Sequence, residues 1–140
     1  MEIFDSYSMA LWGIWVTIAT LMAQALIAGS TKARRPGAIP GKIDDALSHD
    51  SFVFRAHRTF MNSLENLPAL FGTAFLAILA GADPGWTGTL IWVFAGARLL
   101  HMALYYGIAT EKNPSPRTWF YLIALIANVA LLVLAAMALL

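Results

Sequence analysis

The sequence predicts an all-α integral membrane protein, a single domain over residues 1–140 that folds as a bundle of four transmembrane helices. The first observation is composition, because 59% of the residues are hydrophobic and only 12% are charged, which is too apolar for a soluble domain of this length. The second is the presence of four apolar runs, each close to or above the roughly 20 residues that cross a bilayer. The third is that every lysine and arginine outside these runs lies in the first or third connection between them.

The four apolar runs end where glycine, proline and charged residues gather. The second run is slightly short for a span, so the polar turns before it should begin near or within the membrane boundary. The segment GADPG predicts a tight turn between the second and third runs, and the prolines of TEKNPSPR predict a non-helical connection between the third and fourth. The runs cover residues 9–28, 67–82, 86–109 and 119–140.

The first run resembles a secretory signal only in part. Residues 23–25 read Ala-Gln-Ala, like a cleavage site, but the run is preceded by Glu2 and Asp5 and by no basic residue. A signal peptide begins with positive charge and has a shorter apolar stretch. We therefore expect a retained transmembrane helix.

The basic residues also predict the direction of the chain. Loops that stay in the cytoplasm carry an excess of lysine and arginine. The first and third connections are therefore expected to be cytoplasmic, and both termini to face the other side. The basic residues concerned are Lys32, Arg34, Arg35, Lys42, Arg55 and Arg58 in the first connection, and Lys112 and Arg117 in the third.

Several chemistries are unfavoured by composition. The chain has no cysteine, so disulfides, thiolate metal ligands and a cysteine nucleophile are excluded, and any sulfur chemistry must use a substrate's sulfur. A net charge of +1 provides no broad basic surface, so we expect no nucleic-acid partner. His49, His57 and His101 lack paired metal-ligand spacing, so we expect no metal site.

Polar side chains form one stripe on each of three expected helices, toward the cytoplasmic half. Successive residues of a helix turn by about 100°, which brings the members of each set onto one face. Ionisable groups in a bilayer face the protein interior or a wet cavity, and arginine pairs with carboxylates in a bidentate way. The stripes therefore predict a pocket for a small ligand with more than one carboxylate and an amine. Their members are Arg55, Arg58, Asn62 and Glu65, then Arg98, His101 and Tyr105, then Arg117, Tyr121 and Asn128.

Each stripe also has a structural alternative. Arg55 and Arg58 could extend to anionic lipid at the interface, and Glu65 could be an ion-pair partner of Arg58 or Arg98. Tyrosines and tryptophans are common in interfacial belts, which is the role we prefer for Trp86 and Trp119. Asn128 and Gln24 are expected to form hydrogen bonds between helices.

Four motifs in chain order resemble the signature of the MAPEG superfamily, the membrane-associated proteins in eicosanoid and glutathione metabolism. The pattern Arg-Ala-His-Arg at 55–58 is followed by Asn62, Glu65 and Pro68. Arg98-x-x-His101-x-x-x-Tyr105 resembles the family's third-helix motif, and Arg117-x-x-x-Tyr121 resembles the start of its fourth helix. The residues Ala-Arg-Arg at 33–35 resemble the basic end of its first helix.

The resemblance implies a homotrimer of four-helix subunits, similar to the microsomal glutathione transferases, with glutathione as co-substrate between neighbouring subunits. It implies that Arg117 is catalytic and stabilises the glutathione thiolate. An apolar electrophile or hydroperoxide would enter from the membrane lipid, which makes detoxification the expected role. The implied glutathione-binding residues are Arg55, Arg58, Asn62, Glu65, Arg98, His101, Tyr105 and Tyr121, with Arg34 from a neighbouring subunit.

Two other functions are compatible with the same residues. One is a non-catalytic scaffold of this fold that binds a lipid, a glutathione-like metabolite or a partner helix. The other is a small transporter or proton-coupled channel that relays charge through buried Arg, His and Glu. The outer halves of the spans are nearly without polar groups, which argues against a path through the membrane.

Overall fold

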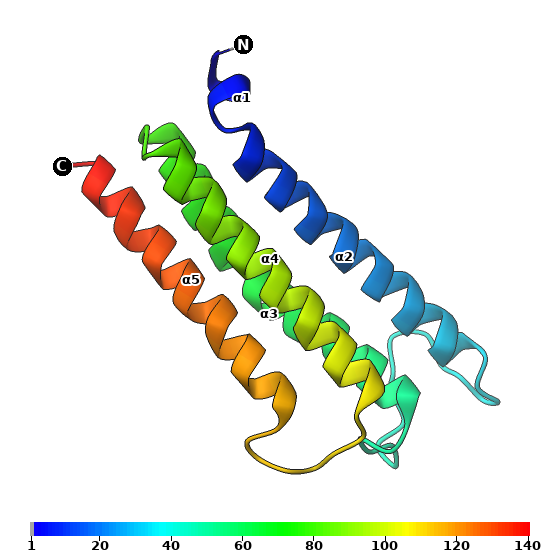
Figure 1. Ribbon diagram of the computed structural model, residues 1–140. Coiled ribbons are helices and arrows are strands. Elements are labelled where there is room, and N and C mark those ends of the chain that lie inside the picture. The colour runs from blue at the N-terminus through cyan, green and yellow to red at the C-terminus, as the bar shows by residue number, and fades with distance from the viewer. Residues whose placement is uncertain (1) are drawn as a thin grey trace.

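The computed structural model describes residues 2–140, and in these residues all regular secondary structure is helical. A short helix α1 (Glu2–Ser6) precedes four long helices that run side by side (Figure 1). The long helices are α2 (Ser8–Ala33), α3 (Phe52–Leu79), α4 (Pro84–Gly107) and α5 (Pro116–Ala138).

Three of these helices, α2, α4 and α5, are long and apolar enough to cross a membrane. Together they confirm an integral membrane fold. Helix α3 contains the second expected span, but it begins well before it, at Phe52, so the polar stripe of residues 55–65 lies on the same continuous helix. Helix α2 likewise continues through Ala33, several residues beyond the expected end of the first span.

The four long helices form one bundle with both termini at one end. Helix α4 packs against α2, α3 and α5, and α3 also packs against α2 and α5. The α2–α3 and α4–α5 connections meet at the end opposite the termini (Figure 1). The two basic connections therefore lie at the same end of the bundle, as expected.

Helix ends are specified locally. The Asp83 carboxylate accepts a hydrogen bond of 2.8 Å from the backbone N–H of Trp86, which caps the first turn of α4. Gly81, at φ +72°, makes the tight turn that precedes it. Ser115 and Thr118 form a capping box at the start of α5. Pro84 and Pro116 occupy the first helical positions, where a missing N–H costs nothing.

The core lies between the apolar faces of the helices and is rich in small side chains. Gly13 of α2 lies so close to α4 that a Cβ atom there would be 2.7 Å from Ile91 Cγ2. Small residues at such crossings let helix backbones approach closely. The largest fully buried apolar side chains are Phe94, Leu70, Ile91 and Leu131.

Buried polar side chains give a mixed result for the expected hydrogen bonds between helices. Asn128 confirms its expectation, since its Oδ1 accepts a 2.5 Å hydrogen bond from Thr73 Oγ1 of α3. For Gln24 the expectation is wrong. Its side chain is completely buried, and neither amide atom has a hydrogen-bond partner within residues 2–140. Trp86 and Trp119 are both exposed, as interfacial residues would be.

Candidate functional site

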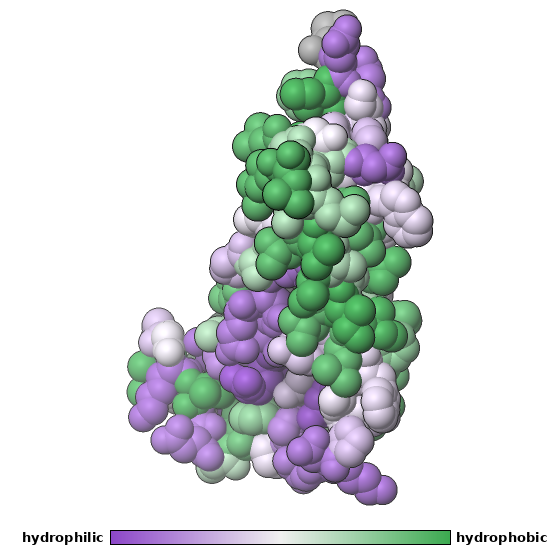
Figure 2. All heavy atoms as spheres, turned by 90° about the vertical axis from the view of Figure 1, so that its left-hand side faces the viewer, coloured by the Kyte–Doolittle hydropathy of each residue, from purple (hydrophilic) through white to green (hydrophobic). Residues whose placement is uncertain are grey.

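A cavity of about 240 Å³ opens between α3, α4 and α5 toward the end that carries the two connections. On the face shown in Figure 2, hydrophilic side chains gather in this half of the bundle, whereas hydrophobic ones cover most of the other half. Six of the ten predicted site residues line the cavity. They are Arg58, Asn62, His101, Tyr105, Arg117 and Tyr121, and Thr118 completes the lining.

Helical spacing explains how these side chains meet. Each of the three helices contributes a pair four residues apart, and such pairs lie on one face, one above the other. The pairs are Arg58 with Asn62 on α3, His101 with Tyr105 on α4, and Arg117 with Tyr121 on α5.

Arg117 is held in a defined place in this cavity. Its guanidinium carbon lies 4.0 Å from the centre of the Tyr105 ring, a favourable distance for a cation over an aromatic face. One of its terminal nitrogens is 3.2 Å from Nε2 of His49. The predicted catalytic cation is therefore positioned by two neighbours.

Two buried polar atoms on the cavity residues lack partners. Asn62 Oδ1 and His101 Nδ1 form no hydrogen bond within residues 2–140. Buried polar groups are almost always satisfied, so an unpaired group at a cavity indicates a missing partner such as a ligand or water. Two guanidinium groups, at Arg58 and Arg117, supply positive charge beside them. The cavity is therefore suited to an anion that also carries hydrogen-bonding groups.

Arg55 does not line the cavity. Its guanidinium donates hydrogen bonds to three backbone carbonyls, at 2.6 Å to His49, 3.0 Å to Asp50 and 3.3 Å to Tyr106. It thereby ties the end of the α2–α3 connection to the last turn of α4. In this subunit the side chain has a structural environment that the stripe did not predict.

Arg98 also lies outside the cavity, deeper in the bundle. Its side chain is buried and donates a 3.0 Å hydrogen bond to Ser63 Oγ, while its other terminal nitrogen has no partner within residues 2–140. It lines a separate void of about 10 Å³ among α2, α3 and α4, a size that admits at most one water molecule.

The remaining two predicted residues, Arg34 and Glu65, lie on the outer surface. Arg34 follows the last turn of α2, and Glu65 is exposed on α3. In the described part of the chain, the carboxylates in contact with basic side chains are Asp44, which pairs with Arg35, and Glu111, which contacts the ring of His49. The alternative in which Glu65 pairs with Arg58 or Arg98 is therefore not realised within one subunit.

His49 and Glu111 are neighbours of the site that sequence reasoning missed. Each lies in a connection rather than on a helical stripe, and they are 62 positions apart in the chain. Helical periodicity contains no information about such a pair. Hydrogen bonds from His49 hold the pKa of the Glu111 carboxyl below its usual value, since they stabilise the charged form.

A second cavity, of about 230 Å³, is lined by the α2–α3 connection and the adjoining ends of α2 and α3. It contains none of the predicted site residues. Its charged lining consists of Lys32, Arg35, Lys42, Asp44 and Asp45.

The fold and the site together define the class of protein: an all-α membrane bundle with a cationic cavity at one end. The MAPEG family model matches residues 9–137, nearly the whole chain. The protein therefore belongs to the MAPEG family, as the four motifs indicated. The searches of curated proteins and of solved structures each gave no match.

Proposed function

We propose that this protein is a membrane-bound glutathione transferase with glutathione peroxidase activity. It would bind glutathione in the cavity of α3, α4 and α5 and activate its thiol for attack on an apolar electrophile or hydroperoxide. The observation that carries the proposal is the cavity itself, which is lined by the two cations Arg58 and Arg117 together with Asn62. Family membership supports glutathione as the ligand.

The cavity chemistry fits the charged groups of glutathione. Its carboxylates would pair with guanidinium groups, which bind carboxylates through parallel N–H donors. An unpaired Oδ1 at Asn62 is a suitable acceptor for an ammonium or amide N–H. Tyr105 and Tyr121 offer hydroxyl groups at the same cavity.

Arg117 is the residue that we assign to catalysis. A cation beside a thiol lowers the thiol pKa and so raises the fraction of thiolate, which is the nucleophile. Because the chain contains no cysteine, glutathione would supply the reactive sulfur. Fixed placement of Arg117 over Tyr105 means that little reorganisation is needed when negative charge develops.

The proposal includes a homotrimer. Glu65 is exposed on a helix that packs within the membrane bundle, and Arg34 is exposed at the end of α2. An exposed carboxylate beside lipid is costly, whereas a neighbouring subunit could cover and pair it. Arg34 would then reach the cavity of that neighbour. Helix α3 would be the fourth transmembrane helix, with the two connections cytoplasmic and both termini on the other side.

Calorimetric titration of glutathione into the detergent-solubilised protein tests the proposal, with Arg58→Ala as the matched variant. We expect saturable binding that is lost or weakened at least tenfold in the variant, since a bidentate pair is removed. Turnover with a panel of electrophiles and hydroperoxides then tests catalysis. A folded trimer that binds no glutathione would overturn the proposal and favour the scaffold. Binding without turnover would remove the catalytic part alone.

A further inference from the structure

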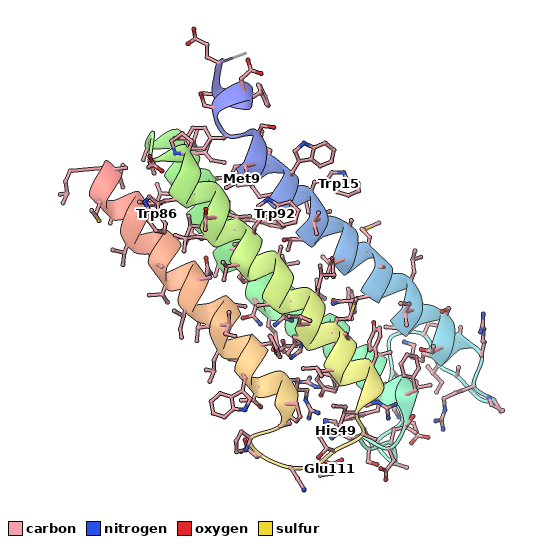
Figure 3. All side chains as sticks on the ribbon, in the orientation of Figure 1. Met9, Trp15, His49, Trp86, Trp92 and Glu111 are labelled. Atoms are coloured by element: carbon pink, nitrogen blue, oxygen red, sulfur yellow. The ribbon has the colours of Figure 1, made fainter. Side chains whose placement is uncertain are left out.

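His49 and Glu111 join the two connections at the end of the bundle where the cavity opens. His49 lies between α2 and α3, and Glu111 lies between α4 and α5 (Figure 3). The Nδ1 atom of His49 is 2.8 Å from Glu111 Oε1. The backbone N–H of His49 donates to the same oxygen at 3.1 Å. One carboxylate oxygen therefore holds both the main chain and the ring.

The other ring nitrogen of His49 faces the cavity residues. Its Nε2 atom lies 3.0 Å from the Tyr105 hydroxyl and 3.2 Å from a terminal nitrogen of Arg117. A guanidinium has only donors, so Nε2 must be the acceptor in this contact. The proton of the neutral ring is therefore on Nδ1, where it is donated to Glu111.

The ring is also fixed by packing. It stacks on Tyr105 at an interplanar angle of 21° and makes an edge contact with Phe54. Arg55 donates a 2.6 Å hydrogen bond to the carbonyl of His49, which anchors its backbone. The side chain is only 19% exposed. Such a ring is preorganised rather than placed at random on a loop.

From this arrangement we infer that His49 is a positioning residue that holds Arg117 over Tyr105 through its neutral Nε2 atom, with Glu111 fixing the tautomer. The inference deepens the proposed function and rests on it for the role of Arg117. It assigns to two loop residues a task that no helical motif specifies.

Steady-state kinetics at neutral pH with His49→Gln and His49→Leu tests this role. Glutamine keeps a neutral acceptor for Arg117 and a donor for Glu111, whereas leucine keeps neither. We expect His49→Leu to lower kcat roughly tenfold, the scale of a hydrogen bond to a charged group, with little change in the KM for glutathione. His49→Gln should keep most of the parent's kcat.

Two kinetic results would overturn the inference. In the first, the glutamine and leucine variants lose the same activity, which would indicate that His49 only packs. In the second, His49→Leu keeps the parent's kcat, which would indicate that Arg117 does not depend on its contact with His49.

A second measurement is independent of turnover. Nitrogen-15 NMR of histidine-labelled protein in micelles reports which ring nitrogen carries the proton, and His49→Gln identifies the signal. We expect the Nδ1–H form for His49, and loss of that preference in Glu111→Leu. The Nε2–H form in the parent would overturn the inference even if the protein is an active transferase. Conversely, His49 could carry its proton on Nδ1 in a protein that binds no glutathione. That result would support the His49 contact and reject the proposed function.

Discussion

The two ends of the bundle are held together by different forces. At the end with the termini, small and apolar side chains interlock, as where Gly13 approaches Ile91. At the end with the connections, a few charged and aromatic groups, among them Arg55, His49 and Arg117, link segments that are distant in the chain. Changes at the first end should therefore alter stability, whereas changes at the second should separate stability from function.

The largest effect is expected at Arg117. Replacement by alanine removes the cation beside the proposed thiolate, so turnover should fall by about 100-fold or more, while glutathione binding falls less. Initial rates and calorimetric binding on the same preparation check this. Lys42→Ala, at the second cavity, is the matched control and should behave like the parent. Equal rates for Arg117→Ala and the parent would contradict the assignment.

Arg55 and Arg58 should separate structure from binding. Arg55→Ala removes hydrogen bonds to three backbone carbonyls and should lower the free energy of unfolding by about 2 kcal/mol, since each donor is charged but partly exposed to water. Thermal unfolding in detergent measures it. Arg58→Ala, which faces the cavity, should unfold near the parent's temperature but lose glutathione affinity. If Arg58→Ala instead lowered the unfolding temperature and Arg55→Ala lost glutathione affinity, Arg58 would be the structural residue and Arg55 the binding residue.

Gly13 tests the apolar end. A methyl group there would lie 2.7 Å from Ile91 Cγ2, so Gly13→Ala should destabilise the bundle by about 1 kcal/mol through overpacking. Gly96→Ala is the control, because among residues 2–140 no atom apart from the adjoining residues and backbone of its own helix lies within 4 Å of its Cβ position. That change should be neutral or stabilising by up to about 1 kcal/mol. Similar melting temperatures for both variants would show that α2 and α4 are not in close contact.

A smaller effect is expected for the hydrogen bond between α3 and α5. Thr73→Val removes the donor to Asn128 and should cost about 0.6 kcal/mol, the average for such bonds in membrane helices. Thr20→Val is matched to it, because the Thr20 hydroxyl bonds only to a carbonyl of its own helix, at Val16. A larger loss for Thr20→Val would contradict the prediction.

The smallest effect concerns Glu111, whose carboxyl has a lowered pKa because of its hydrogen bonds to His49. A lowered folded-state pKa contributes stability above the unfolded-state value, and that stability is lost as pH falls through the folded-state value. Thermal unfolding should therefore show Glu111→Gln below the parent at neutral pH. The difference should shrink in acid, below the ordinary value of 4.5. A constant difference at all pH values would exclude this ionisation as its cause.

Most of the cavity could be predicted because its residues follow helical periodicity. Pairs such as Arg58 with Asn62 are four residues apart and so share one face of a helix. Exposing polar side chains to the bilayer costs free energy, which requires that this face point inward. The same argument placed Arg55 and Arg98 in the cavity, where they do not lie. Periodicity fixes the face of a helix but not the depth of a side chain, nor whether a nearby carbonyl or hydroxyl binds it first.

The sequence by itself determined a helical membrane protein, three of the four expected spans, the family and the three polar stripes. Each of these depends on local composition, on spacing along one helix, or on motif order. Only the tertiary structure decided that Arg55 binds loop carbonyls, that Gln24 is buried with no partner among residues 2–140, and that His49 lies between Glu111 and Arg117. Those outcomes depend on how two connections fold against each other, and contacts between residues distant in the chain leave no periodic pattern in it.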